Sequence, residues 1–165
     1  MRWNFKMSGI LSLEGKDLSR ANLSFARLYF ANLKGANLSH SHAARAIFHG
    51  AELIDANLKD TDLTGADLTF ANLSGAYLFG ANLYGANLTR ARMEGANLSG
   101  ADLSRADLTF ANLSGANLSG ANLHGANLKD ADLYGANLTN ANVSATALRW
   151  ANPTGATMPD GTVYS

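Results

Sequence analysis

The chain has 165 residues, of which 13 are basic and 13 are acidic, so its formal net charge at neutral pH is zero. This length fits one domain with its own core, and the balanced charge offers no overall field of the kind that attracts nucleic acid. The sequence contains no cysteine, which excludes a disulfide framework, a thiolate nucleophile and any metal site with cysteine ligands.

The N-terminal segment, residues 1–17, contains positive charge but lacks the unbroken apolar stretch that a signal peptide needs. No other segment approaches the roughly 18 apolar residues of a membrane span. We therefore expect a soluble, cytoplasmic protein that does not contact a membrane. Trp3, Phe5 and Ile10 are placed to cover the open end of the domain that follows, which predicts an N-terminal cap over residues 1–10.

From residue 11 to residue 158 the sequence repeats with a period of five, without an insertion. The central position of the repeat, stepped by five from Leu13 to Leu148, is Leu in all cases but Ala43, Phe48, Met93 and Val143. Two positions before the 28 centres the residue is Ala 23 times, with Lys16, Ser41, Thr61 and Thr146 among the departures, and the position just before the centre is mostly Asn or Asp. Of the 16 glycines, 14 stand two positions after a centre. We call each five-residue repeat, which begins two residues before its centre, a pentad.

A period of five matches neither the 3.6-residue period of a helix nor the 2-residue period of a strand, so the chain must turn once in every pentad. In short extended pieces joined by tight turns, Leu and the small residue both point inward. Gly at the corner suits the third residue of a type II turn, which has positive φ. Asn or Asp beside the turn can accept a hydrogen bond from its backbone.

The corner residues indicate four pentads per coil, because their pattern recurs at every fourth pentad. The corner at residue 15, and the equivalent corner of every fourth pentad after it, is Gly in all cases but Asp55. The corner series that begins at residue 30 reads instead Phe, Gly, Phe, Arg, Phe, Asp, Trp. This predicts a Gly-dependent turn at the corner series that begins at residue 15 and a type I turn at the series that begins at residue 30. Seven coils at about 4.8 Å give a rod about 34 Å long.

Runs such as ADLTFANLSGANLSGANLHGANLKDADLYGANL resemble the pentapeptide repeat family over residues 11–158. The resemblance implies an all-β fold, a right-handed quadrilateral β-helix of about seven coils of four pentads. The closing segment ATMPDGTVYS is similar to the ends of cyanobacterial members. Pro153, Pro159 and Asp160-Gly161 are placed to stop strand pairing, which predicts a C-terminal tail or cap over residues 159–165. The family resemblance also allows an end-to-end homodimer.

We expect no catalytic, cofactor-binding or metal-binding residues, because a rod of short sides offers no pocket with convergent titratable groups. His40 and His49 fall at outward positions on different predicted sides, His42 replaces the usual Asn, and His124 stands alone. Six acidic residues occupy the Asn position, where turn bonding accounts for them better than general acid chemistry: Asp17, Asp62, Asp67, Asp102, Asp107 and Asp132. We therefore expect that the chain is not an enzyme.

The outward positions hold the candidate protein-binding residues. Along one corner an aromatic residue recurs at every eighth pentad with Arg90 between two of them, which predicts cation-π contact; a second cluster falls within one coil. The candidates are Phe30, Phe70, Arg90, Phe110, Trp150, Tyr77, Phe79 and Tyr84. Exposed aromatics are enriched at protein interfaces, but stacked aromatics also reinforce neighbouring strands, and the sequence leaves both interpretations open.

The composition favours a rigid, non-enzymatic scaffold for an unidentified protein partner, with no direct binding of nucleic acid. Irregular outward positions that would join such a surface are Arg27, Ile47, Glu52, Tyr77 and Arg92. The alternative, which the family resemblance implies, is a DNA mimic that inhibits or protects a type II topoisomerase. A mimic of this length needs on the order of 20 excess negative charges, and this chain has a net charge of zero.

Overall fold

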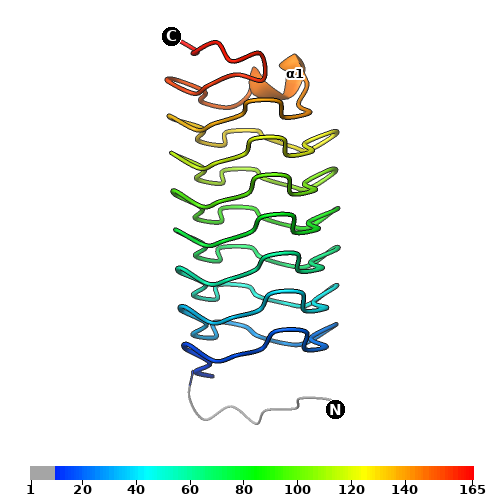
Figure 1. The fold of residues 1–165 in the computed structure, drawn as a ribbon. Coiled ribbons are helices and arrows are strands. Elements are labelled where there is room, and N and C mark those ends of the chain that lie inside the picture. The colour runs from blue at the N-terminus through cyan, green and yellow to red at the C-terminus, as the bar shows by residue number, and fades with distance from the viewer. Residues whose placement is uncertain (1–9) are drawn as a thin grey trace.

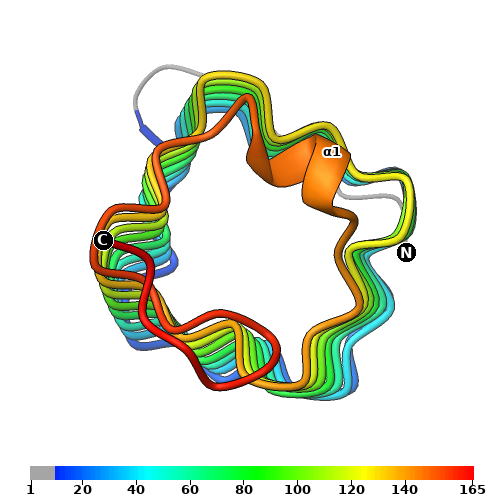
Figure 2. The ribbon, with the colours of Figure 1, turned by 90° about the horizontal axis from the view of Figure 1, so that it is seen from above.

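The computed structural model describes residues 10–165 as a four-sided solenoid (Figure 1). Single-residue parallel bridges join positions four pentads apart, from Ser12 with Asn32 to Asn137 with Thr157, which makes about seven coils. Seen along the axis, the chain runs counterclockwise as it rises toward its C-terminal end, so the coil is right-handed (Figure 2). The predicted right-handed quadrilateral β-helix is confirmed.

We number the four sides by the pentads that form them. Side 1 contains the pentad that begins at residue 11 and every fourth pentad after it. Sides 2, 3 and 4 are counted in the same way from the pentads that begin at residues 16, 21 and 26. The fifth residue of each pentad forms the corner that carries the same number as its side. Corner 1 thus contains Gly15 and Gly35, and corner 4 contains Phe30 and Gly50.

Backbone hydrogen bonding explains the Asn/Asp position of the pentad. In residues 101–105, the N–H groups of Asp102, Leu103 and Arg105 donate to carbonyls of the neighbouring coils at 2.9, 2.8 and 3.0 Å, and the N–H of Ala101 closes the preceding turn. Only the N–H of Ser104 has no backbone acceptor, and it donates to Oδ1 of Asp102 at 3.0 Å. The Asn or Asp side chain therefore satisfies the one donor that the coil leaves over.

The predicted turn-bonding role of the six aspartates is confirmed. Each accepts a hydrogen bond from the N–H two residues further along, in the pairs Asp17 with Ser19, Asp62 with Thr64, Asp67 with Thr69, Asp102 with Ser104, Asp107 with Thr109 and Asp132 with Tyr134. Amides of the next coil add a second bond in several columns, as Asn122 does to Asp102 at 3.1 Å. These ladders tie successive coils together on the outside of the rod.

The core is a continuous column of Leu and Ala, as predicted. Nearly all central and small residues between Leu23 and Ala141 are buried, most of them completely. Ala43 and Phe48 share a coil and are both fully buried, so the small and the large residue complement each other there. Leu13 and Leu18, in the first coil, are only partly buried.

The prediction of a type I turn at corner 4 was wrong. A type I turn has negative φ at its third residue, whereas the corner residues have positive φ: Phe30 54°, Phe70 59°, Arg90 58°, Phe110 59° and Asp130 57°. The reason lies in the stacking of the coils. The N–H of Phe70 donates to the carbonyl of Thr89 in the next coil, while the N–H of Ala71 closes the turn to Leu68. Every corner must present its N–H in the same way, with or without glycine.

The helix α1, Ala145–Leu148, interrupts the repeat in the last coil. The Ser144 side chain caps it by accepting from the N–H of Ala147 at 3.1 Å. The bridge that the register would place between Asn127 and Ala147 is absent. Two residues favour this departure: Ala145 stands at a corner that requires positive φ, and Ala147 lacks the side-chain oxygen of the Asn/Asp position.

The C-terminal residues fold back over the last coil (Figure 1). Val163 forms an antiparallel bridge with Thr157, and Tyr164 exchanges backbone bonds with Gly155 and Ala156. At the other end, the predicted cap residues Trp3 and Phe5 lie outside the described residues, and Ile10 is exposed. Within residues 10–165 no helix is long and apolar enough to cross a membrane.

Candidate protein-interaction surface

Five side chains from successive coils form a stack on corner 4, which we call the aromatic column: Phe30, His49, Phe70, Arg90 and Phe110. The Arg90 guanidinium lies 5.6 Å from the Phe70 ring centroid and 5.4 Å from that of Phe110, so the predicted cation-π contact is confirmed. His49 meets the rings of Phe30 and Phe70 edge to face, with centroids 5.5 and 5.6 Å apart.

His49 is the member of the column that the sequence analysis missed. It stands one position before the corner, and the corner residue itself is Gly50. A Cβ at Gly50 would lie 2.5 Å from the Phe30 ring, so glycine leaves the space that this ring occupies. The signal in the sequence was a ring-bearing residue next to the one glycine of the corner, between Phe30 and Phe70.

The column is stacked and yet largely in solvent. The exposed fraction is 57% for Phe30, 49% for Phe70 and 49% for Phe110. Each residue also has positive φ, which costs a non-glycine residue about 1 kcal/mol. The stacking contacts offset part of this cost, and roughly half of each ring remains available to a partner.

Trp150 does not belong to the aromatic column. It follows α1, and Asp130 separates it from Phe110 along corner 4. The N–H of Asp130 donates to the carbonyl of Trp150 at 2.6 Å, where the regular repeat would use residue 149. A shallow pocket of about 330 Å³ lies at this place, lined by Asp130, Ala131, Asp132, Trp150, Ala151 and Asn152.

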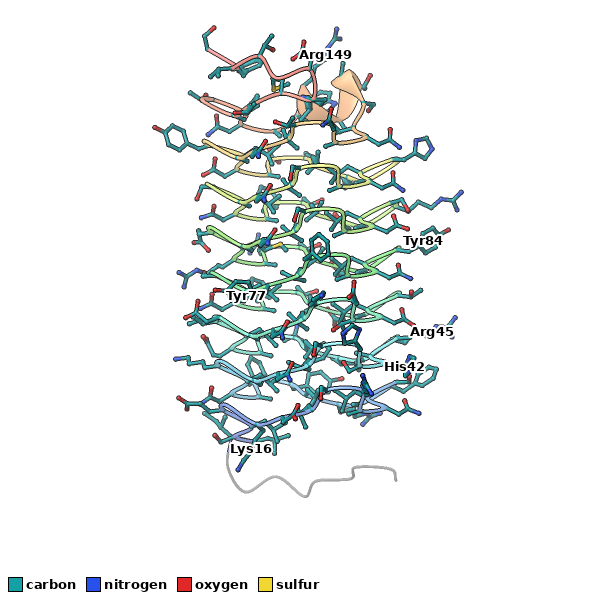
Figure 3. The ribbon with its side chains drawn as sticks, in the orientation of Figure 1. Lys16, His42, Arg45, Tyr77, Tyr84 and Arg149 are labelled. Carbon is teal, nitrogen blue, oxygen red and sulfur yellow. The ribbon has the colours of Figure 1, made fainter. Side chains whose placement is uncertain are left out.

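The predicted cluster of Tyr77, Phe79 and Tyr84 is divided between two sides. Tyr77 and Tyr84 point in different directions from the rod (Figure 3). Phe79 lies against the Lys59 ammonium on side 2, and Tyr84 lies against the Arg105 guanidinium at corner 3, with cation to ring-centroid distances of 5.9 and 5.8 Å. The three residues share a coil but do not form one surface.

Two of the irregular positions, Glu52 and Arg92, belong to a polar network on side 1. Glu52 accepts from the Asn72 amide at 3.0 Å, and Arg92 forms an ion pair with Glu94 at 3.3 Å. Desolvation by burial opposes ionisation of Glu94, but hydrogen bonds from its own N–H and the Ser74 hydroxyl, together with Arg92, lower its pKa below the ordinary value. These charges are satisfied within the chain.

Two other carboxylates have lowered pKa values because of turn hydrogen bonds. The N–H of Ser19, followed by its hydroxyl, lowers the pKa of Asp17, and the hydroxyl of Thr162, followed by its N–H, lowers that of Asp160. Both aspartates lie in turns, so these shifts report hydrogen bonding and not a reactive acid.

The histidines do not converge. His40 lies 3.7 Å from Asp60 on side 2, whereas His49 lies between two rings at corner 4. In the part of the chain that the structure describes, there is no group of three or more His, Asp or Glu residues that could hold a metal ion.

Comparison with known proteins identifies the repeat. The family model for pentapeptide repeats matches in eight copies, over residues 12–39, 31–69, 71–109, 106–144 and 116–155. A search of curated proteins gave no significant match.

Three of the similar solved structures come from cyanobacteria. HetL of Nostoc sp. strain PCC 7120, a protein involved in the regulation of heterocyst differentiation, is 35% identical; the match covers 93% of this chain and 78% of HetL, with a TM-score of 0.61. Rfr23 of Cyanothece 51142 is 44% identical over 60% of this chain and 64% of its own, with a TM-score of 0.47. The protein alr5209 of Nostoc PCC 7120 is 46% identical over 55% and 69%, with a TM-score of 0.43.

Proposed function

Because the chain belongs to the pentapeptide repeat family, we propose that it is a rigid, non-enzymatic scaffold that binds another protein through the aromatic column. The observation that carries the proposal is the half-exposed set of Phe30, Phe70 and Phe110 at corners with positive φ. Glycine occupies such corners elsewhere in the rod without backbone strain. Aromatic rings in this position increase the contact area that a partner can bury.

The solenoid suits such a role because its backbone donors and acceptors are almost completely paired between coils. A surface built on so regular a framework loses little conformational entropy on binding. HetL, which matches 93% of this chain, is involved in the regulation of heterocyst differentiation, and such a role is consistent with a binding scaffold. The location of the protein in the cytoplasm stays a prediction from the sequence.

The placement of charge gives no support to the alternative of DNA mimicry. Within residues 10–165 the aspartates of sides 3 and 4 alternate with asparagines from coil to coil: Asp62 lies below Asn82, and Asp67 below Asn87. Their Oδ1 atoms also accept turn hydrogen bonds. A column of closely spaced charges, which a mimic of DNA requires, is not formed by these residues.

Affinity capture from a lysate of the source organism tests the proposal with a variant that keeps the fold. Changing Phe70, Arg90 and Phe110 to Gly removes three side chains and also relieves three positive-φ strains, so the rod should stay folded. The matched control changes Arg20, His40 and Asn140 to Gly at corner 2, where φ is also positive. We expect the column variant to lose a protein that the wild type and the control both retain. If all three capture the same proteins in equal amounts, the aromatic column is not the binding surface.

A further inference from the structure

Some cationic residues of the rod make ion pairs, others lie over aromatic rings, and Lys59 does both. Within residues 10–165 the ion pairs are those of Asp60 with His40 and with Lys59 on side 2, and that of Arg92 with Glu94 on side 1. The arginines at the two corners that border side 4 have aromatic partners instead. Arg45 lies 5.9 Å from the Phe25 ring centroid and Arg105 lies 5.8 Å from that of Tyr84 at corner 3, while Arg90 lies between Phe70 and Phe110 at corner 4.

Side 4 has few carboxylates to balance these arginines. Between residues 25 and 110 its midline contains Arg27 and Ile47 where most pentads have Asn or Asp. The two acidic residues on this stretch are Asp67 and Asp107, and Oδ1 of each accepts both the N–H and the hydroxyl of the threonine two residues further along. This stretch thus contains four guanidinium groups, those of Arg27, Arg45, Arg90 and Arg105, and two carboxylates, so it has an excess of positive charge on a chain whose total charge is zero.

We infer that side 4, with corners 3 and 4, binds an acidic segment of a protein partner. The aspartate and glutamate side chains of that segment pair with Arg45, Arg90 and Arg105. This inference rests on the proposed function and adds the chemistry of the partner. A guanidinium stacked on a ring still presents its N–H edge, and that planar fork matches a carboxylate in bidentate geometry. The ring contact also fixes the arginine side chain, so less entropy is lost when the carboxylate binds.

Single-stranded nucleic acid fits this surface less well than an acidic protein segment. Binding of unpaired bases uses aromatic faces on which the bases stack. In the aromatic column His49 and Arg90 already occupy the gaps between successive phenylalanine rings. The free groups that remain are guanidinium edges and ring edges, which suit carboxylates flanked by apolar side chains.

Titration with poly-L-glutamate at low salt, followed by the Nε–H signals of arginine in NMR spectra of the wild type, tests the inference directly. We expect the signals of Arg45, Arg90 and Arg105 to shift, and that of Arg92 to stay, because Arg92 is paired with Glu94. Two triple variants with equal charge change provide the affinity comparison: R45Q/R90Q/R105Q on side 4 and the control R20Q/K34Q/R92Q on sides 1 and 2. The side-4 variant should bind poly-L-glutamate about 10-fold or more weakly, and the control within about 2-fold of the wild type.

Three results would overturn the inference. They are equal losses in both triple variants, no binding of poly-L-glutamate to the wild type, and binding of a dT oligonucleotide that is as tight and as sensitive to the side-4 substitutions. The last result would identify a nucleic-acid surface. The proposed function is tested separately, by the capture experiment with the glycine variant. If the glycine variant loses a partner that R45Q/R90Q/R105Q still binds, only the acidic chemistry of the partner is refuted.

Discussion

Replacing Ala101 by Leu tests how tightly the coils are packed. Ala101 is fully buried, and so are Ala81 and Ala121, which occupy the same position in the adjacent coils. Leu has three more carbon atoms than Ala, and with the alanines above and below also fully buried we expect the larger side chain to push the coils apart. A separation of about 1 Å would break the hydrogen bonds of this side, because they are already near their normal length.

The magnitude follows from the bonds that would be lost. Side 3 of this coil makes three backbone bonds to the coil below and three to the coil above, among them Asp102 N–H to Ala81 C=O and Asn122 N–H to Ala101 C=O, both at 2.9 Å. At about 0.5–1.5 kcal/mol each, losing one set of three costs about 1.5–4.5 kcal/mol, and overpacking adds about 1–3 kcal/mol. Ala101→Leu should therefore destabilise the protein more than Leu103→Ala, for which we expect about 2–5 kcal/mol.

Denaturant melts of Ala101→Leu should separate into two transitions, since a solenoid is stabilised by contacts between neighbouring coils and a broken interface uncouples its two parts. The assay follows circular dichroism for the whole rod and tryptophan fluorescence for its C-terminal end, in a Trp3→Phe background that leaves Trp150 as the single tryptophan. Ala101→Ser in the same background is the control for a change without overpacking: Ser41 is buried at the equivalent position of another coil with its hydroxyl unpartnered among the described residues, so we expect a cost of about 1–3 kcal/mol and a single transition. One transition near the wild-type midpoint would refute tight packing at the small position.

Three further predictions concern the stability of the fold. Leu103→Ala should cost several times more than Ser99→Ala, for which we expect under about 0.5 kcal/mol in urea melts; equal costs would contradict the inward and outward assignment. Asp102→Asn should be nearly neutral and Asp102→Ala should cost about 1 kcal/mol, because only Ala fails to accept from the Ser104 N–H. The pKa values of Asp17, Glu94 and Asp160 are lowered in the folded state, so their ionised carboxylates should stabilise the fold at pH values above the ordinary carboxyl pKa. This stabilisation should be lost as the pH falls through the lowered pKa values of the folded state. The midpoint temperature of thermal melts should thus fall below about pH 4, and this fall should be smaller in D17N/E94Q/D160N. The same fall in the variant as in the wild type would contradict the prediction.

The fold could be predicted from the sequence because each pentad contains the residues that determine its own conformation. Leu and Ala specify the inward positions, and Asn or Asp supplies the one acceptor that the backbone lacks, as Asp102 shows. The recurrence of corner residues at every fourth pentad indicates the number of sides from the sequence alone. Because every coil repeats the same contacts, one correct register places all of them.

The turn at corner 4 could not be predicted from residue preference alone. Phe and Arg disfavour positive φ, and so the corner was assigned a type I turn. The stacked coils impose the same N–H direction on every corner, and this tertiary requirement exceeds the local cost at Phe70 and Arg90. The backbone preference of a single residue is therefore overridden where the hydrogen bonds between coils require one φ at every corner.

The candidate surface was predicted in part. Phe70, Arg90 and Phe110 followed from their spacing of four pentads, because that spacing places side chains in direct contact. His49 was missed, since it stands one position before the corner and joins the column only because Gly50 has no side chain. Trp150 stays a predicted surface residue outside the aromatic column, because Asp130 stands between it and Phe110 and α1 interrupts the repeat before it.

Measuring stability and partner affinity in the same variant tests most directly whether the aromatic column is a binding surface or a brace between coils. In Phe70→Gly/Arg90→Gly/Phe110→Gly the lost stacking, about 0.5–1 kcal/mol per contact, is offset by relief of positive φ at three corners. We predict a free energy of unfolding within about 1 kcal/mol of the wild type and an affinity for the captured protein reduced by about 10-fold or more, measured by calorimetry. A variant that is several kcal/mol less stable and binds the partner with unchanged affinity would show that the column only braces the coils.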